Sequence, residues 1–209
     1  MKKHGSIIYV VDDDVSVCKA LSLLLESHSF TVVTFTRAEN FLAFKHPPKI
    51  PSCLVLDISL PDINGLALQE AMAVRKLSIP IIFITGHGDI PMSVKAMKAG
   101  AVDFLPKPFT KKKLINAITL AIAKNKTDNK KTAEVRKIER HIKTLTPREL
   151  EVFRLVANGF LSKQIAYKLG TTLQTIKVHR SRVMRKMQAH SVTELIHFAQ
   201  KAGITSFQG

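Results

Sequence analysis

Five polar side chains stand directly after short apolar runs in the first half of the chain, and together they could carry out phosphoryl chemistry. Asp12 and Asp13 follow the run "IIYVV", and Asp57 ends the run "CLVLD". Thr85 ends "IIFIT", and Lys107 follows "DFLP". Three carboxylates in one pocket would raise one another's pKa unless a small hard cation such as Mg²⁺ joined them. Because a carboxylate can attack phosphorus, we predict a magnesium-assisted site with Asp57 as nucleophile, Thr85 as hydrogen-bond donor and Lys107 as neutralising cation.

The segments that must position these residues alternate between strand-like and helical patterns. The strand-like runs are 7–11, 31–35, 53–56, 81–85 and 103–105, and the amphipathic stretches between them include 15–27, 65–76 and 91–99. Runs so apolar must be buried on both faces, which indicates a parallel sheet with helices on either side. The carboxyl ends of such strands meet at one edge. We therefore expect an α/β domain with a doubly wound five-stranded parallel sheet whose edge gathers the five side chains.

Other residues in this half of the chain receive plainer interpretations. Asp14 has no required role, and we interpret it as a solvated acid or a helix N-cap. The segment "TGHGD" lacks the strand-to-helix glycine spacing of a nucleotide-binding motif, so we expect a flexible loop with His87 facing solvent. Cys18 and Cys53 form no CxxC pair and lie among apolar residues, which favours reduced core thiols.

Positive charge is concentrated in the second part of the chain. Residues 1–123 hold 14 basic and 10 acidic residues, net +4, whereas residues 124–209 hold 18 basic and 6 acidic residues, net +12. Such a concentration favours an anionic polymer as partner. The first residues do not form a signal peptide, and no run approaches the roughly 18 apolar residues of a spanning helix. We therefore expect a cytoplasmic protein with no membrane partner.

Composition divides the chain into three parts. Residues 1–123 form the α/β domain, residues 124–143 form a basic linker, and residues 144–209 form a small all-α domain. The linker, "KNKTDNKKTAEVRKIERHIK", has few large apolar residues, although its second half could be helical. We expect a solvated tether between two domains.

Four helices are predicted in the last part, with explicit start signals. Thr146 and Glu149 predict a capping box, and Ser162 predicts an N-cap. Ser191 and Glu194 predict a second capping box. The second and third helices, joined by the tight turn "KLGTT", have the form of a helix-turn-helix.

The third of these helices has two different faces. Its apolar stripe consists of Leu173, Ile176, Val183 and Met187. Its opposite stripe consists of Gln174, Lys177, Val178, Ser181 and Arg185, flanked by Arg180 and Arg182. A single valine among basic and polar side chains suits a thymine methyl group in the major groove of DNA.

About the first 120 residues resemble the receiver domain of two-component response regulators. The matching set consists of Asp12, Asp13, Asp57, Thr85, Phe104 and Lys107, with the segments "LPDING" and "KAMKAGAVDFLPKPF". The resemblance implies a flavodoxin-like receiver in which Asp57 is the phosphoacceptor. It also implies that Asp12, Asp13 and Asp57 hold Mg²⁺ together with the backbone carbonyl of Ser59.

The same resemblance assigns the remaining residues of the set to a switch. Lys107 would contact the phosphoryl group, and a cis bond would join it to Pro108. The hydroxyl of Thr85 would turn toward the phosphoryl group, and Phe104 would move into the space that it leaves. Phosphorylation would in this way gate formation of a homodimer.

Residues 145–202 resemble the LuxR-type DNA-binding domain. The implied contacts with base edges are Lys177, Val178 and Ser181. The residues implied to contact phosphate or support the helix are Thr175, His179 and Arg182. Ser181 departs from family members that carry a long basic residue there, so the resemblance implies DNA binding but does not imply their base preference. The whole chain resembles a NarL/FixJ-family response regulator of the FixJ-like branch.

The resemblance implies a regulator of transcription and not a turnover enzyme. Its partners would be a sensor histidine kinase and double-stranded DNA, with RNA polymerase as a further candidate. Two alternatives stay open. One is a phosphorylation-independent DNA binder with a vestigial receiver. The other is a haloacid-dehalogenase-type phosphatase that uses Asp12 as nucleophile and Asp14 as general acid, which would leave Asp57 and the basic C-terminal domain unexplained.

Overall fold

The chain folds into two compact units, Met1–Asn129 and Lys130–Gly209. The computed structural model describes residues 5–86 and 90–204, so the predicted position of His87 lies outside the described residues. Within the described part, no helix is both long enough and apolar enough to cross a membrane.

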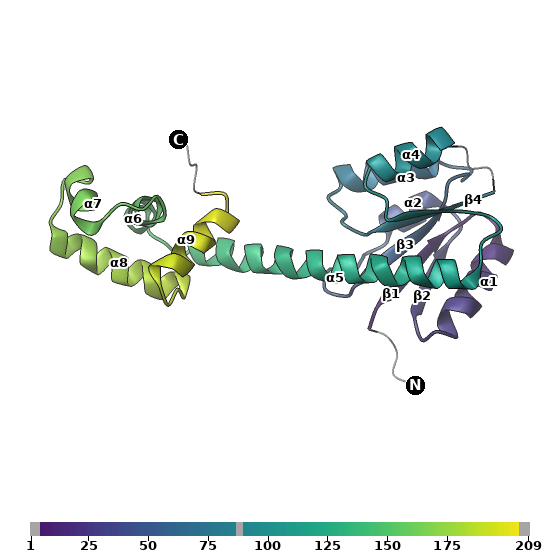
Figure 1. Ribbon diagram of the computed structural model, residues 1–209, viewed down its shortest axis with the longest axis horizontal. Coiled ribbons are helices and arrows are strands. Elements are labelled where there is room, and N and C mark those ends of the chain that lie inside the picture. Colours follow the sequence, from purple (N-terminus) through teal and green to yellow (C-terminus); the bar gives the residue numbers. More distant parts are fainter. Residues whose placement is uncertain (1–4, 87–89, 205–209) are drawn as a thin grey trace. The chain divides into compact units, whose positions relative to one another are not determined.

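Unit 1 contains a five-stranded sheet in which every pair of neighbouring strands is parallel (Figure 1). The strands are β1 (Ile7–Val11), β2 (Thr31–Phe35), β3 (Ser52–Asp57), β4 (Ile81–Thr85) and β5 (Asp103–Pro106), in the order β2-β1-β3-β4-β5. The helices are α1 (Val15–Glu26), α2 (Ala38–Ala43), α3 (Gly65–Val74), α4 (Ile90–Lys98) and α5 (Lys111–Ile142). All five predicted strands are present, and α2 is an additional helix that the sequence pattern did not indicate.

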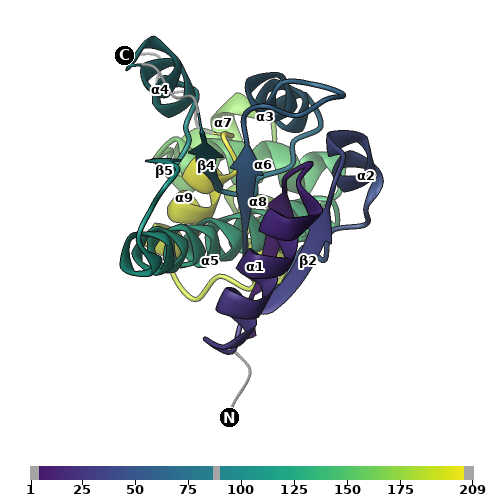
Figure 2. The same cartoon turned by 90° about the vertical axis from the view of Figure 1, so that its right-hand side faces the viewer.

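The sheet is covered on both sides, as Figure 2 shows. On one side, Ile8 and Val10 pack with apolar residues of α1 and α5, such as Leu21 and Ile118. On the other side, the alternate strand residues pack with α2, α3 and α4, among them Phe41, Leu68 and Ala96. Since both faces exclude water, the central strands β1, β3 and β4 are almost entirely buried and mostly apolar, whereas the edge strand β2 has exposed threonines at 31 and 34. The doubly wound α/β fold is confirmed.

The segment predicted as a tether is helical throughout, because α5 continues to Ile142. Its first part belongs to unit 1: Asn125 is buried, accepts a hydrogen bond from the Ser52 backbone N–H at 3.0 Å and donates one to the Ser78 carbonyl at 2.9 Å. Its second part belongs to unit 2, where Ile138 is buried in the apolar core. The segment is therefore packed against each unit through one buried residue, Asn125 in unit 1 and Ile138 in unit 2. Its composition, dominated by exposed charges, did not indicate this packing.

Unit 2 is helical, with α6 (Pro147–Ala157), α7 (Ser162–Lys168), α8 (Leu173–Met187) and α9 (Val192–Lys201) following the end of α5. The capping box of Thr146 and Glu149 is present. The prediction for Ser162 is wrong, because Leu161 is the N-cap of α7 and Gln164 accepts a hydrogen bond from its backbone N–H.

The second predicted capping box is only half formed. Ser191 accepts a hydrogen bond from the Glu194 backbone N–H at 3.1 Å, as expected. The carboxylate of Glu194, however, reaches one residue further back and accepts from the His190 backbone N–H at 2.8 Å. Both hydrogen bonds still satisfy N–H groups at the start of α9.

A buried carboxylate connects the start of α6 with the end of α8. Glu149 is 2% exposed, accepts a hydrogen bond from the Thr146 N–H at 2.9 Å and pairs with the ammonium of Lys186 at 2.6 Å. The ion pair with Lys186, followed by the hydrogen bond from Thr146, lowers the pKa of Glu149 from 4.5 to about 2. The ionised carboxylate therefore stabilises unit 2.

We expect Glu149→Gln to destabilise unit 2 by about 1 to 2 kcal/mol at neutral pH, because Lys186 loses its partner and solvent near the lysine screens part of the full effect. The contribution of Glu149 to the free energy of unfolding is complete above pH 4.5 and is lost as the pH falls toward about 2. Hydrogen exchange of the α6 and α8 amides in the full chain measures the loss of stability caused by Glu149→Gln. Glu151→Gln is the matched control, since its pair with Arg148 is exposed; an equal effect of both substitutions would contradict the assignment.

Candidate functional site

The register of the sheet brings the predicted site residues to its carboxyl edge. Val11 of β1 pairs with Leu56 of β3, so that Asp12 and Asp57 follow side by side. Thr85 is the last residue of β4 and pairs with Pro106, which Lys107 follows directly. Four residues that are far apart in the sequence therefore meet at one edge for a purely geometrical reason.

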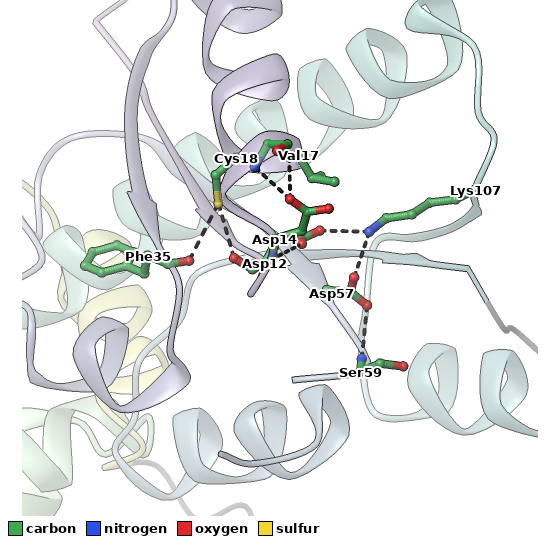
Figure 3. A network of polar contacts seen from close by, with 9 residues as sticks. Asp12, Asp14, Val17, Cys18, Phe35, Asp57, Ser59 and Lys107 are labelled. Carbon is green, nitrogen blue, oxygen red and sulfur yellow. Dashed lines mark hydrogen bonds and ion pairs between the residues drawn. The ribbon is translucent and has the colours of Figure 1, made fainter. Parts of the chain in front are cut away.

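The ammonium of Lys107 bridges two carboxylates at this edge (Figure 3). Its Nζ lies 2.8 Å from Oδ2 of Asp12 and 2.7 Å from Oδ2 of Asp57. The remaining oxygen of Asp57, Oδ1, accepts a hydrogen bond from the Ser59 backbone N–H at 3.0 Å. Both carboxylates are almost completely shielded from solvent, whereas the side chain of Lys107 is about one-quarter exposed (26%). The arrangement holds the oxygens of Asp57 in fixed directions.

The third carboxylate completes a cluster that suits a divalent cation. Ligand oxygens of Asp12, Asp13 and Asp57 all lie within 4.8 Å of one another, with Asp13 on the exposed side. Three carboxylates and one ammonium carry a net charge of about −2. Burial raises the pKa of Asp12 in spite of its hydrogen bond with Lys107. One ammonium thus offsets only part of the cost of burying these acids, and oxygen ligands with an excess of negative charge fit Mg²⁺.

The ammonium itself is stabilised by its two partners. Burial alone would lower the pKa of Lys107, but the hydrogen bonds with Asp12 and Asp57 raise it above its ordinary value. Lys107 therefore remains charged at neutral pH. Its backbone N–H donates to the Thr85 carbonyl at 2.7 Å, and its bond to Pro108 is cis, as the family resemblance implied.

Gly65 leaves room for the backbone of Asp57. A Cβ atom at this position would lie 2.7 Å from the Asp57 carbonyl oxygen and 3.0 Å from Cα of Ile58. Neither backbone atom can move without displacing the end of β3. The glycine of "LPDING" thus lets α3 begin directly against the strand that carries the central carboxylate.

Two residues close to the site have structural roles, one that sequence analysis left open and one that it predicted. Asp14 is the N-cap of α1 and accepts hydrogen bonds from the Ser16 and Val17 N–H groups at 2.7 and 3.4 Å. Cys18 is buried, and its thiol lies 3.3 Å from the Asp12 carbonyl oxygen (Figure 3). The prediction of a reduced core thiol at Cys18 is confirmed.

Thr85 and Phe104 lie on the neighbouring strands β4 and β5. The side chain of Thr85 is almost fully buried, with 1% of its surface exposed. Phe104 is half-buried and packs obliquely against Phe83, with 6.4 Å between ring centroids. Thr85 thus stands at the carboxyl edge, whereas Phe104 pairs with Phe83, two residues before that edge.

In unit 2, the predicted base-contacting residues form an exposed face of α8. Lys177, Val178 and Ser181 are exposed, as is Arg182. The other predicted residues are half-buried: Thr175 shares a hydrogen bond with Thr172, and His179 keeps its Nδ1 buried. The four exposed side chains are accessible to a partner, whereas the two half-buried ones belong partly to the packing of α8.

The two stripes predicted for α8 need correction at two positions. Leu173 is 43% exposed and does not share the core with Ile176, because it stands at the very first turn of the helix. Arg180, predicted to flank the basic face, is half-buried and donates a hydrogen bond to the Ser162 hydroxyl at 2.6 Å. Sequence spacing could not show that an arginine of α8 is engaged by α7.

Comparison with known protein families agrees with both units. Residues 8–119 match the response regulator receiver domain, and residues 143–199 match the bacterial regulatory proteins of the luxR family. The chain belongs to the LuxR-type response regulators. Members of this family regulate transcription and are generally not turnover enzymes. As a two-component response regulator, the protein has a kinase and DNA as its expected classes of partner.

Relatives of this response regulator match it over most of its length. Nodulation protein W of Bradyrhizobium diazoefficiens is 43% identical over 96% of this chain and 88% of its own. The transcriptional regulatory protein FixJ of Rhizobium meliloti is 40% identical over 94% and 96%. Among solved structures, the response regulator StyR is 42% identical, covers 94% of this chain and 98% of its own, and has a TM-score of 0.82.

Proposed function

We propose that Asp57 accepts a phosphoryl group from a sensor histidine kinase and that this modification controls DNA binding by α8. The observation that carries the proposal is the bridge of Lys107 between Asp12 and Asp57, beside the third carboxylate of Asp13. A carboxylate held by one ammonium at 2.7 Å, on a cluster with excess negative charge, suits attack on phosphorus assisted by cations.

Phosphoryl transfer from the kinase to Asp57 exchanges one P–N bond for one P–O bond. One oxygen of Asp57 attacks the phosphorus of a phosphohistidine, the P–N bond breaks, and its electron pair returns to the imidazole, which takes a proton from solvent. Bound Mg²⁺, held by Asp12, Asp13, Asp57 and the backbone carbonyl of Ser59, would neutralise phosphoryl oxygens. Lys107 is placed to contact the same oxygens. The chain acts as an acceptor and not as a turnover enzyme.

The aspartyl phosphate would act through the neighbouring strands. It carries a charge of about −2 where the carboxylate carried −1, and the Thr85 hydroxyl and Lys107 can respond to this change. Movement of Phe104 into the space left by Thr85 would rearrange the surface of α4, β5 and α5. If that surface pairs only in the phosphorylated state, the phosphorylated protein becomes a homodimer. Its two helix-turn-helix units would then bind one operator together more tightly than a single unit does.

The exposed face of α8 would read the operator. Lys177, Val178 and Ser181 would face base edges in the major groove, and Arg182 would contact phosphate, with Thr175 and His179 supporting the helix. The partners are then a histidine kinase, double-stranded DNA and, as a further candidate, RNA polymerase. A protein that acts on DNA in this way would work in the cytoplasm.

The two alternatives have less support. The phosphatase interpretation needs Asp14 as a general acid, but Asp14 accepts two backbone hydrogen bonds as the N-cap of α1. A vestigial receiver would have no need for the complete set of Asp13, Asp57, Thr85 and Lys107. The experiments below distinguish each alternative from phosphorylation-gated DNA binding.

With Mg²⁺ and a small acyl phosphate, we expect the intact mass of the protein to rise by one phosphoryl group. Asp57→Asn abolishes the gain because it removes the nucleophile, and Asp13→Asn raises the Mg²⁺ concentration needed because it removes a ligand. Asp14→Asn is the matched control, since asparagine also caps helices and labelling persists. Full labelling of Asp57→Asn would refute the site, and steady release of phosphate would favour the phosphatase.

On DNA, Lys177→Ala should change the preferred operator bases, whereas Arg182→Ala should weaken all sequences together and flatten the salt dependence of binding by about one unit. Footprinting and binding titrations at several salt concentrations measure both effects. If the Lys177 variant retains the parental base preferences, the proposed reading face is wrong.

With beryllofluoride as a phosphoryl mimic, we expect a dimer at micromolar concentration and mainly monomer without it, as measured by sedimentation. Thr85→Ala should still be phosphorylated yet dimerise poorly because the responding hydroxyl is missing. Thr85→Ser keeps the hydroxyl and should dimerise normally. Equal mass distributions with and without beryllofluoride would rule out phosphorylation-gated dimerisation.

A further inference from the structure

The first helix of the helix-turn-helix is weakly held by apolar packing. Helix α7 has seven residues, of which only Ile165 and Ala166 are buried. Leu161, before its first turn, is 68% exposed, and Tyr167 is 90% exposed. A helix this short is only marginally stable by itself, so its position depends on contacts with its neighbours. Those neighbours are α6 and α8, against which α7 packs.

Two arginines hold α7, one at each end. At its beginning, Nη1 of Arg180 from α8 donates a hydrogen bond of 2.6 Å to the hydroxyl of Ser162. At its end, Nη2 of Arg148 from α6 donates a hydrogen bond of 2.7 Å to the carbonyl of Leu169, the C-cap residue. The second contact also places a cation at the negative end of the helix.

The side chain of Arg180 does not share the exposed face of α8. It is half-buried, while Ser181 and Arg182 beside it are exposed. It follows buried Ile176 by four residues, a spacing that places it next to the apolar stripe of the helix. Its guanidinium is therefore directed to α7, where Ser162 accepts its hydrogen bond.

We propose that Arg180 is a positioning residue for DNA recognition and not a DNA contact: through Ser162 it fixes α7 against α8, and Arg148 fixes the other end. The inference rests on the proposed reading of DNA by α8. Specific recognition requires α8 to lie in the major groove while α7 crosses the DNA backbone in one fixed arrangement, whereas non-specific binding depends mainly on charge. Loss of the contact between Arg180 and Ser162 should therefore lower the affinity for the operator and leave the non-specific affinity for DNA unchanged.

The test compares operator and non-operator DNA at several salt concentrations, using the full chain. We expect Arg180→Ala to weaken operator binding about tenfold, the effect of losing one hydrogen bond from a charged group, with non-specific affinity and salt slope unchanged. Arg180→Gln retains a neutral donor for Ser162 and should restore most of the operator affinity. Ser162→Ala is a milder route to the same loss, and the double variant should be no worse than Arg180→Ala alone.

Other roles of Arg180 give different results. A phosphate contact would lower both affinities, flatten the salt slope by about one unit and resist rescue by glutamine, as expected for the control Arg182→Ala. A purely structural role would lower both affinities by the same unfolded fraction, visible by circular dichroism. Either outcome, or no loss at all, overturns the proposal.

Hydrogen exchange without DNA separates this proposal from the proposed function of α8. Arg180→Ala should speed exchange of the α7 amides while those of α6 remain protected. If α7 loosens but neither Lys177→Ala nor Arg182→Ala affects DNA binding, the contact is real and the reading face is wrong. If α7 does not loosen, Arg180 does not position it.

Discussion

The interaction on which the receiver unit depends is the bridge of one ammonium between two buried carboxylates. Asp12 and Asp57 end adjacent strands and are shielded from solvent, so their charges would repel strongly without Lys107 between them. That requirement fixes the position of the segment after β5 relative to the ends of β1 and β3, which the sheet already holds side by side. The apolar strands bring the three residues together, and their electrostatics then allow only a narrow arrangement at the sheet edge.

The surroundings of the bridge are built to keep that arrangement. Asp14 caps α1 and directs the chain away from the edge, and its own N–H donates to Asp12 Oδ1 at 3.0 Å. Gly65 lets α3 start against the Asp57 backbone. On the other side, the Lys107 N–H is tied to the Thr85 carbonyl. Each carboxylate oxygen of Asp12 and Asp57 therefore has a hydrogen-bond partner within the protein.

Sequence reasoning succeeded where the signal is local or periodic. All five strands, the Thr146 capping box and the residues of the acidic edge follow from spacing, because strand ends and caps are set by neighbouring residues. It missed α2, which has six residues and no side-chain N-cap, and it gave Ser162 a capping role that Leu161 and Gln164 fill. The contacts of Asn125 with Ser52 and of Arg180 with Ser162 join residues 73 and 18 positions apart, and nothing in the local sequence marks such partners.

Two buried carboxylates show how the same kind of contact can serve structure or chemistry. Glu149 in unit 2 pairs with one lysine and caps a helix, and the pKa of its carboxyl falls to about 2, so its charge is fully compensated. Asp12 also pairs with one lysine, which it shares with Asp57, and burial keeps the pKa of Asp12 above its ordinary value. A compensated charge contributes to stability and has no need of a further ligand, whereas an under-compensated cluster favours an additional cation. Glu149 thus holds α6 to α8 through one lysine of its own, whereas Asp12 shares its lysine with Asp57 beside a third carboxylate, an arrangement suited to metal-assisted phosphoryl chemistry.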